Sequence, residues 1–259
     1  MTQQYRPLIP VNPQGLDDIA EGLLNTSSPN VEANDFAPNK NGFIYVPSIN
    51  LYVSKERTLQ NKNWNDTHKE VLRNGLGRMP TPNETWELIK YAKANLSNPE
   101  LKNVYDDILK TTPQNTWHGE WQNAKFSEDK KIKYVQRVIS LDKQGELVYS
   151  PRERLDDYLI EDCWAEFNST NKQGLLTRKH SSLSYAQGQN IYFYHPRNNS
   201  VARFGANSDG AYLNCGGNPS YSYSALGVRL VREATPRKIP QYNFNTCTSS
   251  RDSNSFIFS

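Results

Sequence analysis

The side chains that most often bind metals are thinly spread along this sequence of 259 residues. None of its four histidines begins an HExxH motif or pairs with a second histidine at a spacing that suits a shared metal ion. The three cysteines, Cys163, Cys215 and Cys247, are far apart and odd in number. That pattern argues against a disulfide framework and against a cysteine-based zinc site. We therefore predict that no metal is bound and that the thiols are reduced. A single disulfide is the alternative.

Motifs for catalysis are equally scarce. His118-Gly119-Glu120 has the H-x-E spacing of zinc deaminases, but no P-C-x-x-C sequence follows it. No G-x-S-x-G nucleophile motif occurs, and Gly75-Leu76-Gly77 lacks the third glycine and the preceding strand of a dinucleotide-binding loop. A cluster of carboxylates would suit acid–base catalysis, but a solvated helix face explains it better: Glu153, Asp156, Asp157, Glu161 and Asp162. We predict no catalytic residue, no enzyme activity and no cofactor.

The charge pattern limits the classes of partner. The formal net charge is only +3, and the basic residues are scattered along the chain. The one dense basic run, Lys130–Lys133, follows Glu128 and Asp129 and is typical of a solvated face. Nucleic acid is therefore not an expected partner. No stretch of 18 apolar residues occurs, so no membrane span is predicted.

The stretch from Val201 to Glu233, VARFGANSDGAYLNCGGNPSYSYSALGVRLVRE, has two unlike halves. From Arg203 to Tyr223 nearly every residue is Gly, Ser, Asn, Asp, Tyr or Ala, and the apolar run Ala225–Val231 then predicts a buried strand. Tyrosine offers rigid amphipathic contact area, while Ser, Gly and Asn offer adaptable hydrogen bonds, which is the composition of a recognition loop. An ordinary surface loop before a final strand is the alternative.

The elements that must position this stretch begin after an arm. Residues 1–40 are polar with one short amphipathic segment, so we expect an extended N-terminal arm. The aromatic and β-branched runs Phe43–Pro47 and Asn50–Ser54 predict two strands. Residues 55–78 show near-helical spacing of apolar residues, which two glycines interrupt. The start of the sequence lacks a Sec-type signal, which makes the cytoplasm the default location.

Two helices have clear start signals. Thr81 and Glu84 form a capping box with proline at the first helical position, and this helix is expected to end near Asn95. The second helix is expected over Pro99–Leu109, where apolar residues recur at helical spacing after the break at Asn98.

Short strands and loops fill the later part of the chain. Tyr134–Leu141 and Glu146–Tyr149 flank Asp142–Gly145 and predict a hairpin. Ser150–Asp157 is expected to open a helical turn, and Ile191–Tyr194 to form a buried strand.

The order of these elements indicates the fold class. Helices early and hairpins late favour an α+β fold, with two helices packed on small antiparallel sheets. The aromatic segment Trp117–Phe126 is interpreted as core residues on a bent connection. We expect one domain over residues 41–259, which ends in a polar tail at residues 234–259.

The run Ala225-Leu226-Gly227-Val228-Arg229-Leu230 and the mosaic before it resemble the variable region of proteins encoded by diversity-generating retroelements, which adopt a C-type lectin-like fold. In that family, mutagenesis directed at template adenines diversifies AAY codons, from which Asn, Ser, Tyr, Asp, Gly and Arg are all reachable. The early strand pair, the two helices and the tryptophan-rich segment follow the same order as in those proteins. Val228, where better-known members favour phenylalanine, and the polar tail indicate a divergent branch of the archaeal type.

The resemblance implies a hypervariable recognition site at about residues 200–224 on a fixed framework. The framework is expected to comprise small and apolar residues: Val201, Ala202, Phe204, Ala206, Ala211, Leu213, Cys215, Pro219 and the terminal strand. The exposed alternates are the expected ligand-binding positions: Arg203, Gly205, Asn207, Asp209, Tyr212, Asn214, Gly216, Gly217, Asn218, Tyr221 and Tyr223. Such positions can vary because surface substitutions usually change stability by about 0.5 kcal/mol or less. Only Asp209 is acidic here, so no calcium is expected.

The expected partner is a protein or another surface ligand, bound by a monomer. The resemblance also implies surface display or export. Two other classes stay open. An enzyme of the formylglycine-generating type would share the fold and a similar chain ending, but it needs a pair of cysteines. A structural protein of a phage or surface appendage would form trimers.

Overall fold

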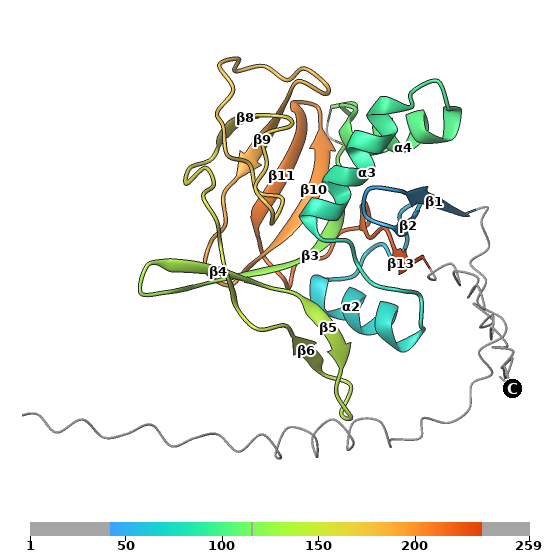
Figure 1. Cartoon of the computed structure of the whole chain (residues 1–259), viewed down its shortest axis with the longest axis vertical. Helices are drawn as coiled ribbons and strands as arrows, with labels where there is room; N and C mark the ends of the chain where they lie inside the picture. The colour runs from blue at the N-terminus through green and yellow to red at the C-terminus, as the bar shows by residue number, and fades with distance from the viewer. Residues whose placement is uncertain (1–41, 115, 235–259) are drawn as a thin grey trace, which may run out of the picture. The chain divides into compact units, whose positions relative to one another are not determined.

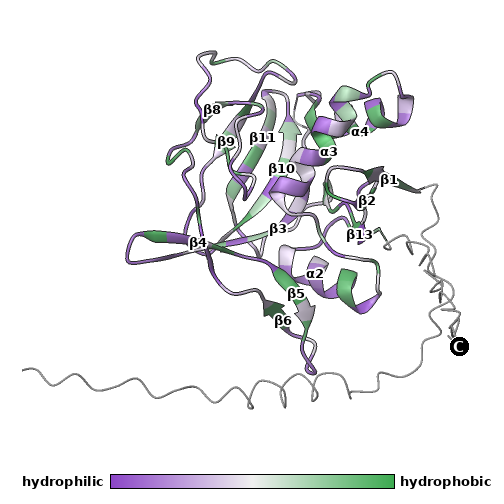
Figure 2. Ribbon diagram, in the orientation of Figure 1, coloured by the Kyte–Doolittle hydropathy of each residue, from purple (hydrophilic) through white to green (hydrophobic). Residues whose placement is uncertain are grey.

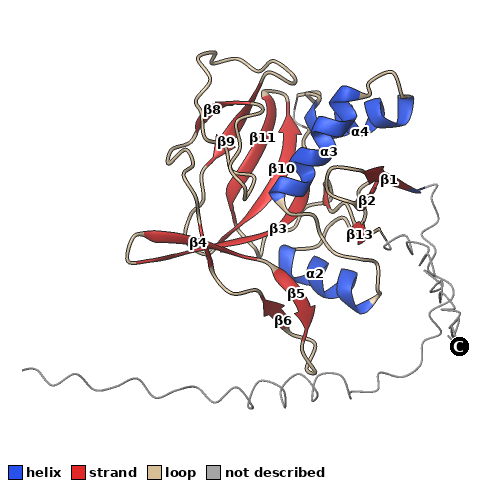
Figure 3. Cartoon of the chain, viewed as in Figure 1, coloured by secondary structure: helices blue, strands red, loops and turns tan. Residues whose placement is uncertain are grey.

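The structure of the protein, a computed structural model, describes residues 42–114 and 116–234, which form an α+β fold (Figures 1 and 3). The predicted N-terminal arm, the predicted tail beyond residue 234 and Cys247 lie outside these residues. In chain order the elements are β1 (Phe43–Val46), β2 (Leu51–Ser54), α2 (Trp64–Arg73), α3 (Pro82–Ala94), α4 (Pro99–Leu109), β3 (His118–Asp129), β4 (Ile132–Gln136), β5 (Val138–Leu141), β6 (Leu147–Tyr149), β7 (Glu153–Arg154), β8 (Cys163–Glu166), β9 (Asn190–Tyr194), β10 (Ser200–Asn207), β11 (Gly210–Gly217), β12 (Leu226–Gly227) and β13 (Val231–Glu233).

The two predicted helices, α3 and α4, are present with their predicted ends. At the start of α3 the Thr81 hydroxyl accepts a hydrogen bond from the Glu84 amide at 3.3 Å. The Glu84 carboxylate in turn accepts one from the Thr81 amide at 2.8 Å, which completes the capping box. The Asn98 side chain caps α4 by accepting hydrogen bonds from the amides of Glu100 and Leu101. Local capping chemistry therefore sets both starts.

A third helix, α2, corrects the expectation of two helices. The Asn63 side chain caps it by accepting a hydrogen bond from the Asp66 amide at 2.9 Å. Two residues after its last residue, Arg73, Gly75 takes a φ of 59°, which glycine adopts without strain. Figure 2 shows hydrophobic and hydrophilic stretches on each helix, as amphipathic packing requires. None of the described helices is long and apolar enough to cross a membrane.

The main sheet is larger and more mixed than the small antiparallel sheets that we expected. Its strands follow the order β7-β4-β3-β10-β11-β9-β8, and β12 pairs with β3. Most neighbours are antiparallel, but β9 runs parallel to β11 and β12 runs parallel to β3. A smaller sheet, β1-β2-β13, joins the first and last described strands. β5 and β6 form the predicted hairpin, but its first strand, expected over Tyr134–Leu141, is divided between β4 and β5, which lie in different sheets. The main sheet therefore gathers strands from the later part of the described chain, whereas the smaller sheet joins its two ends.

The aromatic segment Trp117–Phe126 lies largely in strand β3 rather than in the bent connection that we expected. β3 is buried through most of its length, so apolar and polar residues do not alternate along it. Its buried amide side chains have internal partners. Gln122 accepts a hydrogen bond from Thr85 at 2.6 Å, and Asn123 exchanges two with the backbone of Val138 at 2.8 and 2.9 Å. Contacts with distant segments make this segment a strand.

The carboxylates expected on a solvated helix face lie on strands and loops. The segment expected to open a helical turn contains β7 instead, because β4 offers it a pairing edge. Glu153 pairs with Arg137 at 2.7 Å. Asp162 pairs with His195 at 2.6 Å and with Arg197 at 2.8 Å. These carboxylates are held apart by separate bases, and no group of three metal-ligating side chains gathers in the described part of the chain.

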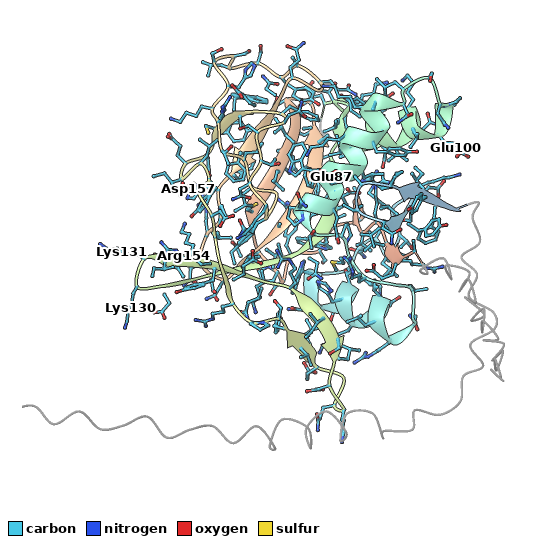
Figure 4. The ribbon with its side chains drawn as sticks, viewed as in Figure 1. Glu87, Glu100, Lys130, Lys131, Arg154 and Asp157 are labelled. Carbon is cyan, nitrogen blue, oxygen red and sulfur yellow. The ribbon has the colours of Figure 1, made fainter. Side chains whose placement is uncertain are left out.

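The basic run forms the tip of the hairpin between β3 and β4. Lys130 and Lys131 are exposed and have φ values of 48° and 68°, in the left-handed region. Figure 4 shows both side chains at the tip, away from the sheet. The prediction of a solvated face is confirmed for Lys130 and Lys131, whereas Lys133 is half-buried in β4 and donates a hydrogen bond to the Pro196 carbonyl at 2.6 Å.

Two hydrophobic cores hold the sheet. The larger lies where α3 and α4 cover one face of β3, β10 and β11 (Figure 1). Trp86 is fully buried there and lies edge-on to Phe167 and Phe204, with ring centroids 5.2 Å apart in both pairs. The second core joins α2 and the end of the described chain, with Trp64 and Trp121 at its centre. One face of β10 and β11 is thus braced by helices, whereas their other face is not covered by α3 or α4.

Acid is expected to weaken the second core through His68. This side chain is buried edge-on to Trp64 at 4.2 Å, and burial lowers its pKa to about 3 from an ordinary value near 6.5. Below pH 6.5 the unfolded chain takes up a proton that the folded chain refuses. Stability therefore falls as the pH drops from about 6.5 towards 3, by at most about 1.4 kcal/mol per pH unit. Urea unfolding of the wild type and of His68→Gln across this range measures the effect, and identical pH slopes would contradict it.

Candidate functional site

Strands β10 and β11 separate two kinds of side chain onto their two faces. Phe204, Ala206, Leu213 and others point into the larger core and are almost fully buried. The residues between them face the other way. The register pairs Arg203 with Asn214 and Gly205 with Tyr212, so outward residues of the two strands lie side by side. Most of the stretch expected to be a recognition loop therefore forms two paired strands, and inward and outward residues alternate along them.

Strands β8 and β9 extend this outward side with a run of aromatic rings. Trp164 pairs with Tyr192 across β8 and β9, and Tyr192 with Tyr212 across β9 and β11. The rings meet largely edge to face, with centroids 5.2 Å apart for Trp164 and Tyr192, 4.9 Å for Tyr192 and Tyr194, and 5.9 Å for Tyr194 and Tyr212. Burial raises the pKa of the Tyr194 and Tyr212 phenols, so both stay neutral hydrogen-bonding groups at physiological pH.

A guanidinium group lies among further rings beside this run. The Arg203 guanidinium carbon is 5.4 Å from the ring centre of Trp117 and 5.5 Å from that of Tyr221. Trp117 stacks on Tyr223 at 4.9 Å. No carboxylate in the described chain forms an ion pair with Arg203, so the rings are its electrostatic partners. We call this surface the aromatic face, defined by Trp117, Trp164, Tyr192, Tyr194, Arg203, Tyr212, Tyr221 and Tyr223.

Most of the expected ligand-binding residues have an accessible surface. Nine of the eleven are exposed or half-buried: Arg203, Asn207, Asp209, Tyr212, Asn214, Gly216, Asn218, Tyr221 and Tyr223. Gly205 and Gly217 are buried and correct the expectation that they are exposed. A Cβ atom on Gly205 would lie 2.6 Å from the Tyr212 ring, and one on Gly217 would lie 2.9 Å from the Val201 carbonyl oxygen. These two glycines make room for neighbours instead of contacting a ligand.

Adding a methyl group at Gly205 is expected to displace the Tyr212 ring. Besides that ring, a Cβ atom there would meet the His118 carbonyl oxygen at 2.8 Å, so part of the obstruction is rigid backbone. We expect Gly205→Ala to lower stability by about 1–3 kcal/mol, as overpacking usually does. Chemical denaturation measures the loss.

Gly216→Ala is the matched control, since a Cβ atom there would meet only the flexible Arg197 side chain, at 3.2 Å. An equal loss of stability in the two variants would mean that Gly205 has no special role beneath Tyr212.

The expected framework is mostly buried, but its terminal strand is broken. Val201 through Cys215 at the framework positions are buried, and Pro219 is half-buried. The run expected to form one strand is divided into β12 and β13. Between them, Val228 bonds with Thr58 through both backbone groups at 2.8 and 2.9 Å. The chain therefore leaves β3 and crosses to the smaller sheet, which a single straight strand would not allow.

The break surrounds Arg229, which is fully buried. Its Nε lies 2.8 Å from the Glu120 carboxylate, in charge contact but without the alignment of a hydrogen bond. It also contacts the Asp107 carboxylate and donates hydrogen bonds to the carbonyls of Ser54 and Lys55. Burial raises the pKa of Glu120, which Arg229 opposes. This residue ties α4, β2 and β3 to the end of the described chain, and a lone arginine in an apolar run was its only signal.

The aromatic residues of β8 and β9 belong to the site but were absent from the expected set. Trp164 and Tyr194 are more than 15 residues apart from one another and precede the expected variable stretch. Ile191–Tyr194 is a strand as predicted, but Tyr192 and Tyr194 are half-buried because one side of β9 faces outward. The sequence showed that these residues are aromatic. It gave no sign that β9 pairs in parallel with β11, which is what brings them into the site.

Comparison of the chain with models of protein families, with curated proteins and with solved structures finds no match. Its function must therefore be argued from the site itself.

Proposed function

We propose that this chain is a non-enzymatic recognition protein, and that the aromatic face is its ligand-binding surface. We further propose that it is a variable protein of a diversity-generating retroelement with a C-type lectin-like fold. The observation that carries the proposal is the separation of the two faces of β10 and β11. Residues such as Phe204 and Leu213 fill the core, whereas Arg203, Tyr212 and Asn214 lie outward on the same strands. Outward residues on a braced sheet can change without loss of the fold.

The composition of the aromatic face supports a binding role. Interfaces and antigen-binding sites are enriched in tyrosine, tryptophan and arginine, and the two aromatic residues bury large areas with few rotatable bonds. Tyr221 and Tyr223 are each 42% exposed, far more than large aromatic residues that serve only a core. Their exposed ring surfaces are therefore available to a partner, beside the half-buried Arg203 guanidinium.

The genome tests the retroelement assignment. We expect a near-copy of the codons for Val201–Tyr223 close to the gene, beside a reverse transcriptase gene, with differences only at adenines. The differences should fall in codons for outward residues such as Tyr212 and Asn214, and spare those for core residues such as Phe204 and Leu213. Without such a copy the retroelement assignment fails, whereas the proposed binding surface would still stand.

The alternative enzyme class gains no support from the described cysteines. Cys163 and Cys215 form no disulfide. Cys215 is fully buried, and burial raises the pKa of its thiol, which is the opposite of an activated thiolate. Thiol titration during copper addition separates the two classes: thiol-dependent, stoichiometric copper binding would favour the enzyme and contradict the binding-protein proposal.

A further inference from the structure

The aromatic face contains a small hollow of about 230 Å³ at its β8–β9 end. Trp164, Tyr192, Tyr194 and Tyr212 line it, together with Asn207 at the end of β10 and Asp209 in the turn that follows. This volume is several times the roughly 30 Å³ that a water molecule takes up in the liquid. It is smaller than the roughly 300–1,000 Å³ of sites that hold drug-sized ligands. The hollow therefore suits one compact chemical group.

The rings stand as walls and do not form a flat platform. Trp164 and Tyr192 are inclined at 86°, Tyr192 and Tyr194 at 61°, and Tyr194 and Tyr212 at 88°. A sugar ring or a nucleobase stacks best on an open, flat ring, whereas these steeply inclined rings line the hollow with both faces and edges. The pairing of β8, β9 and β11 fixes three of the four walls. The absent side chain of Gly205 leaves the space in which the Tyr212 ring lies.

The polar groups at the hollow favour a positive charge without N–H groups. Asp209 is exposed, and no base in the described chain forms an ion pair with it. Asn207 already accepts hydrogen bonds from the backbone amides of Asp209 and Gly210 at 3.0 and 3.1 Å. A primary ammonium group is strongly hydrated, and inside the hollow its three N–H donors would have to exchange water for protein acceptors. A methylated ammonium group needs none, and ring faces attract it electrostatically.

We infer that the hollow formed by Trp164, Tyr192, Tyr194, Tyr212 and Asp209 binds a methylated ammonium group. The four rings surround the cation, and the Asp209 carboxylate at the rim balances its charge. Arg203 does not line the hollow, and its guanidinium lies over Trp117 and Tyr221. This inference rests on the proposed recognition function and deepens it by naming the chemistry of the ligand. Both a free quaternary ammonium compound and a trimethylated lysine of a partner protein carry this group.

Calorimetric titration of the full chain with choline tests the inference. The control ligand is 3,3-dimethyl-1-butanol, which has the shape of choline with carbon in place of the charged nitrogen. We expect saturable 1:1 binding of choline, and binding of the neutral alcohol that is weaker by about tenfold, because only the cation gains the ring attraction. Equal affinities for the two ligands, or no saturable binding of choline, would overturn the inference.

Variants locate the binding on the chain. Trp164→Ala is expected to weaken choline binding by at least about tenfold, and Asp209→Asn by about two- to fivefold, as for an exposed charge pair. Tyr45→Ala, at an exposed tyrosine of β1 outside the aromatic face, should leave choline binding within about twofold of the wild type. Tyr192→Phe removes only the hydroxyl group and keeps the ring, so choline binding should be retained. This variant tests the role of the ring if an alanine variant does not fold. Wild-type affinity in folded Trp164→Ala would overturn the assignment.

Peptides distinguish the two sources of the group. A peptide with trimethyllysine that binds more tightly than choline, while the unmodified peptide does not bind, identifies a partner protein. Equal affinity for the trimethyllysine peptide and choline identifies a small-molecule ligand, and either result supports the inferred chemistry. Failure of every ammonium probe would remove the inferred chemistry alone, because the search for an adenine-variant near-copy tests the retroelement assignment without any ligand.

Discussion

Replacing Arg229 with alanine is expected to lower the free energy of unfolding by about 3–5 kcal/mol, the usual effect of breaking a buried ion pair from one side. The Glu120 carboxylate would stay buried without its counter-charge, and the carbonyls of Ser54 and Lys55 would lose their donor. The connection from α4 to the end of the described chain would also be lost, since Asp107 contacts the same guanidinium. Urea unfolding followed by circular dichroism measures the loss.

Arg232→Ala provides the matched control for this prediction. Arg232 is three residues further along, half-buried, and contacts the Phe43 ring at 4.6 Å and the Leu76 carbonyl at 3.1 Å. Its charge stays in contact with water, so its loss is expected to cost only about 1 kcal/mol. Similar losses of unfolding free energy for the two arginine variants would mean that the buried charge of Arg229 contributes no more to stability than the half-buried charge of Arg232.

Replacing Trp86 with alanine is expected to cost about 3–5 kcal/mol, the range for large aromatic residues in a core. Trp86 is fully buried between α3 and the sheet, where its indole nitrogen donates a hydrogen bond to the Gly174 carbonyl at 2.9 Å. The cavity would lie directly beneath β10, because Trp86 packs on Phe204. Thermal and urea unfolding both measure this change.

The matched comparison is Trp117→Ala, on the opposite face of the sheet. Trp117 is half-buried and makes a stack with Tyr223 and a cation–π contact with Arg203. Those contacts are together worth about 1–2 kcal/mol, so the loss should be clearly smaller. If the two tryptophans contribute equally to stability, the aromatic face stabilises the fold as a hydrophobic core does. The proposed division between a stabilising face and a binding face would then be wrong.

Local chemistry made the helices predictable from the sequence. The capping box of Thr81 and Glu84 and the Asn98 cap act over three residues, so the ends of α3 and α4 follow from neighbours in the chain. The hairpin at Asp142–Gly145 was predictable for the same reason, since Gly145 takes the φ of 81° that its turn requires. The α+β class follows from the order of these elements.

The strands that depend on distant partners could not be predicted from neighbouring residues in the sequence. β3 is buried by α3, β10 and the end of the described chain, so its residues lack the alternation that marks a half-exposed strand. Ser150–Asp157 contains a strand because β4 offers it an edge, although its sequence favours a helical turn. The number of helices was wrong for a related reason, since α2 is stabilised by the second core.

The candidate site likewise has one part that was predictable from the sequence and one part that was not. The composition of the sequence indicated most of the accessible residues between Arg203 and Tyr223, because tyrosines and small polar residues favour a recognition surface, although it predicted a loop where β10 and β11 pair as strands. Only the tertiary structure decided that Trp164, Tyr192 and Tyr194 lie beside Tyr212, and that Arg229 is buried against Glu120. Strand pairing and burial join residues that are far apart in sequence, and alternation within one strand carries no information about its neighbours.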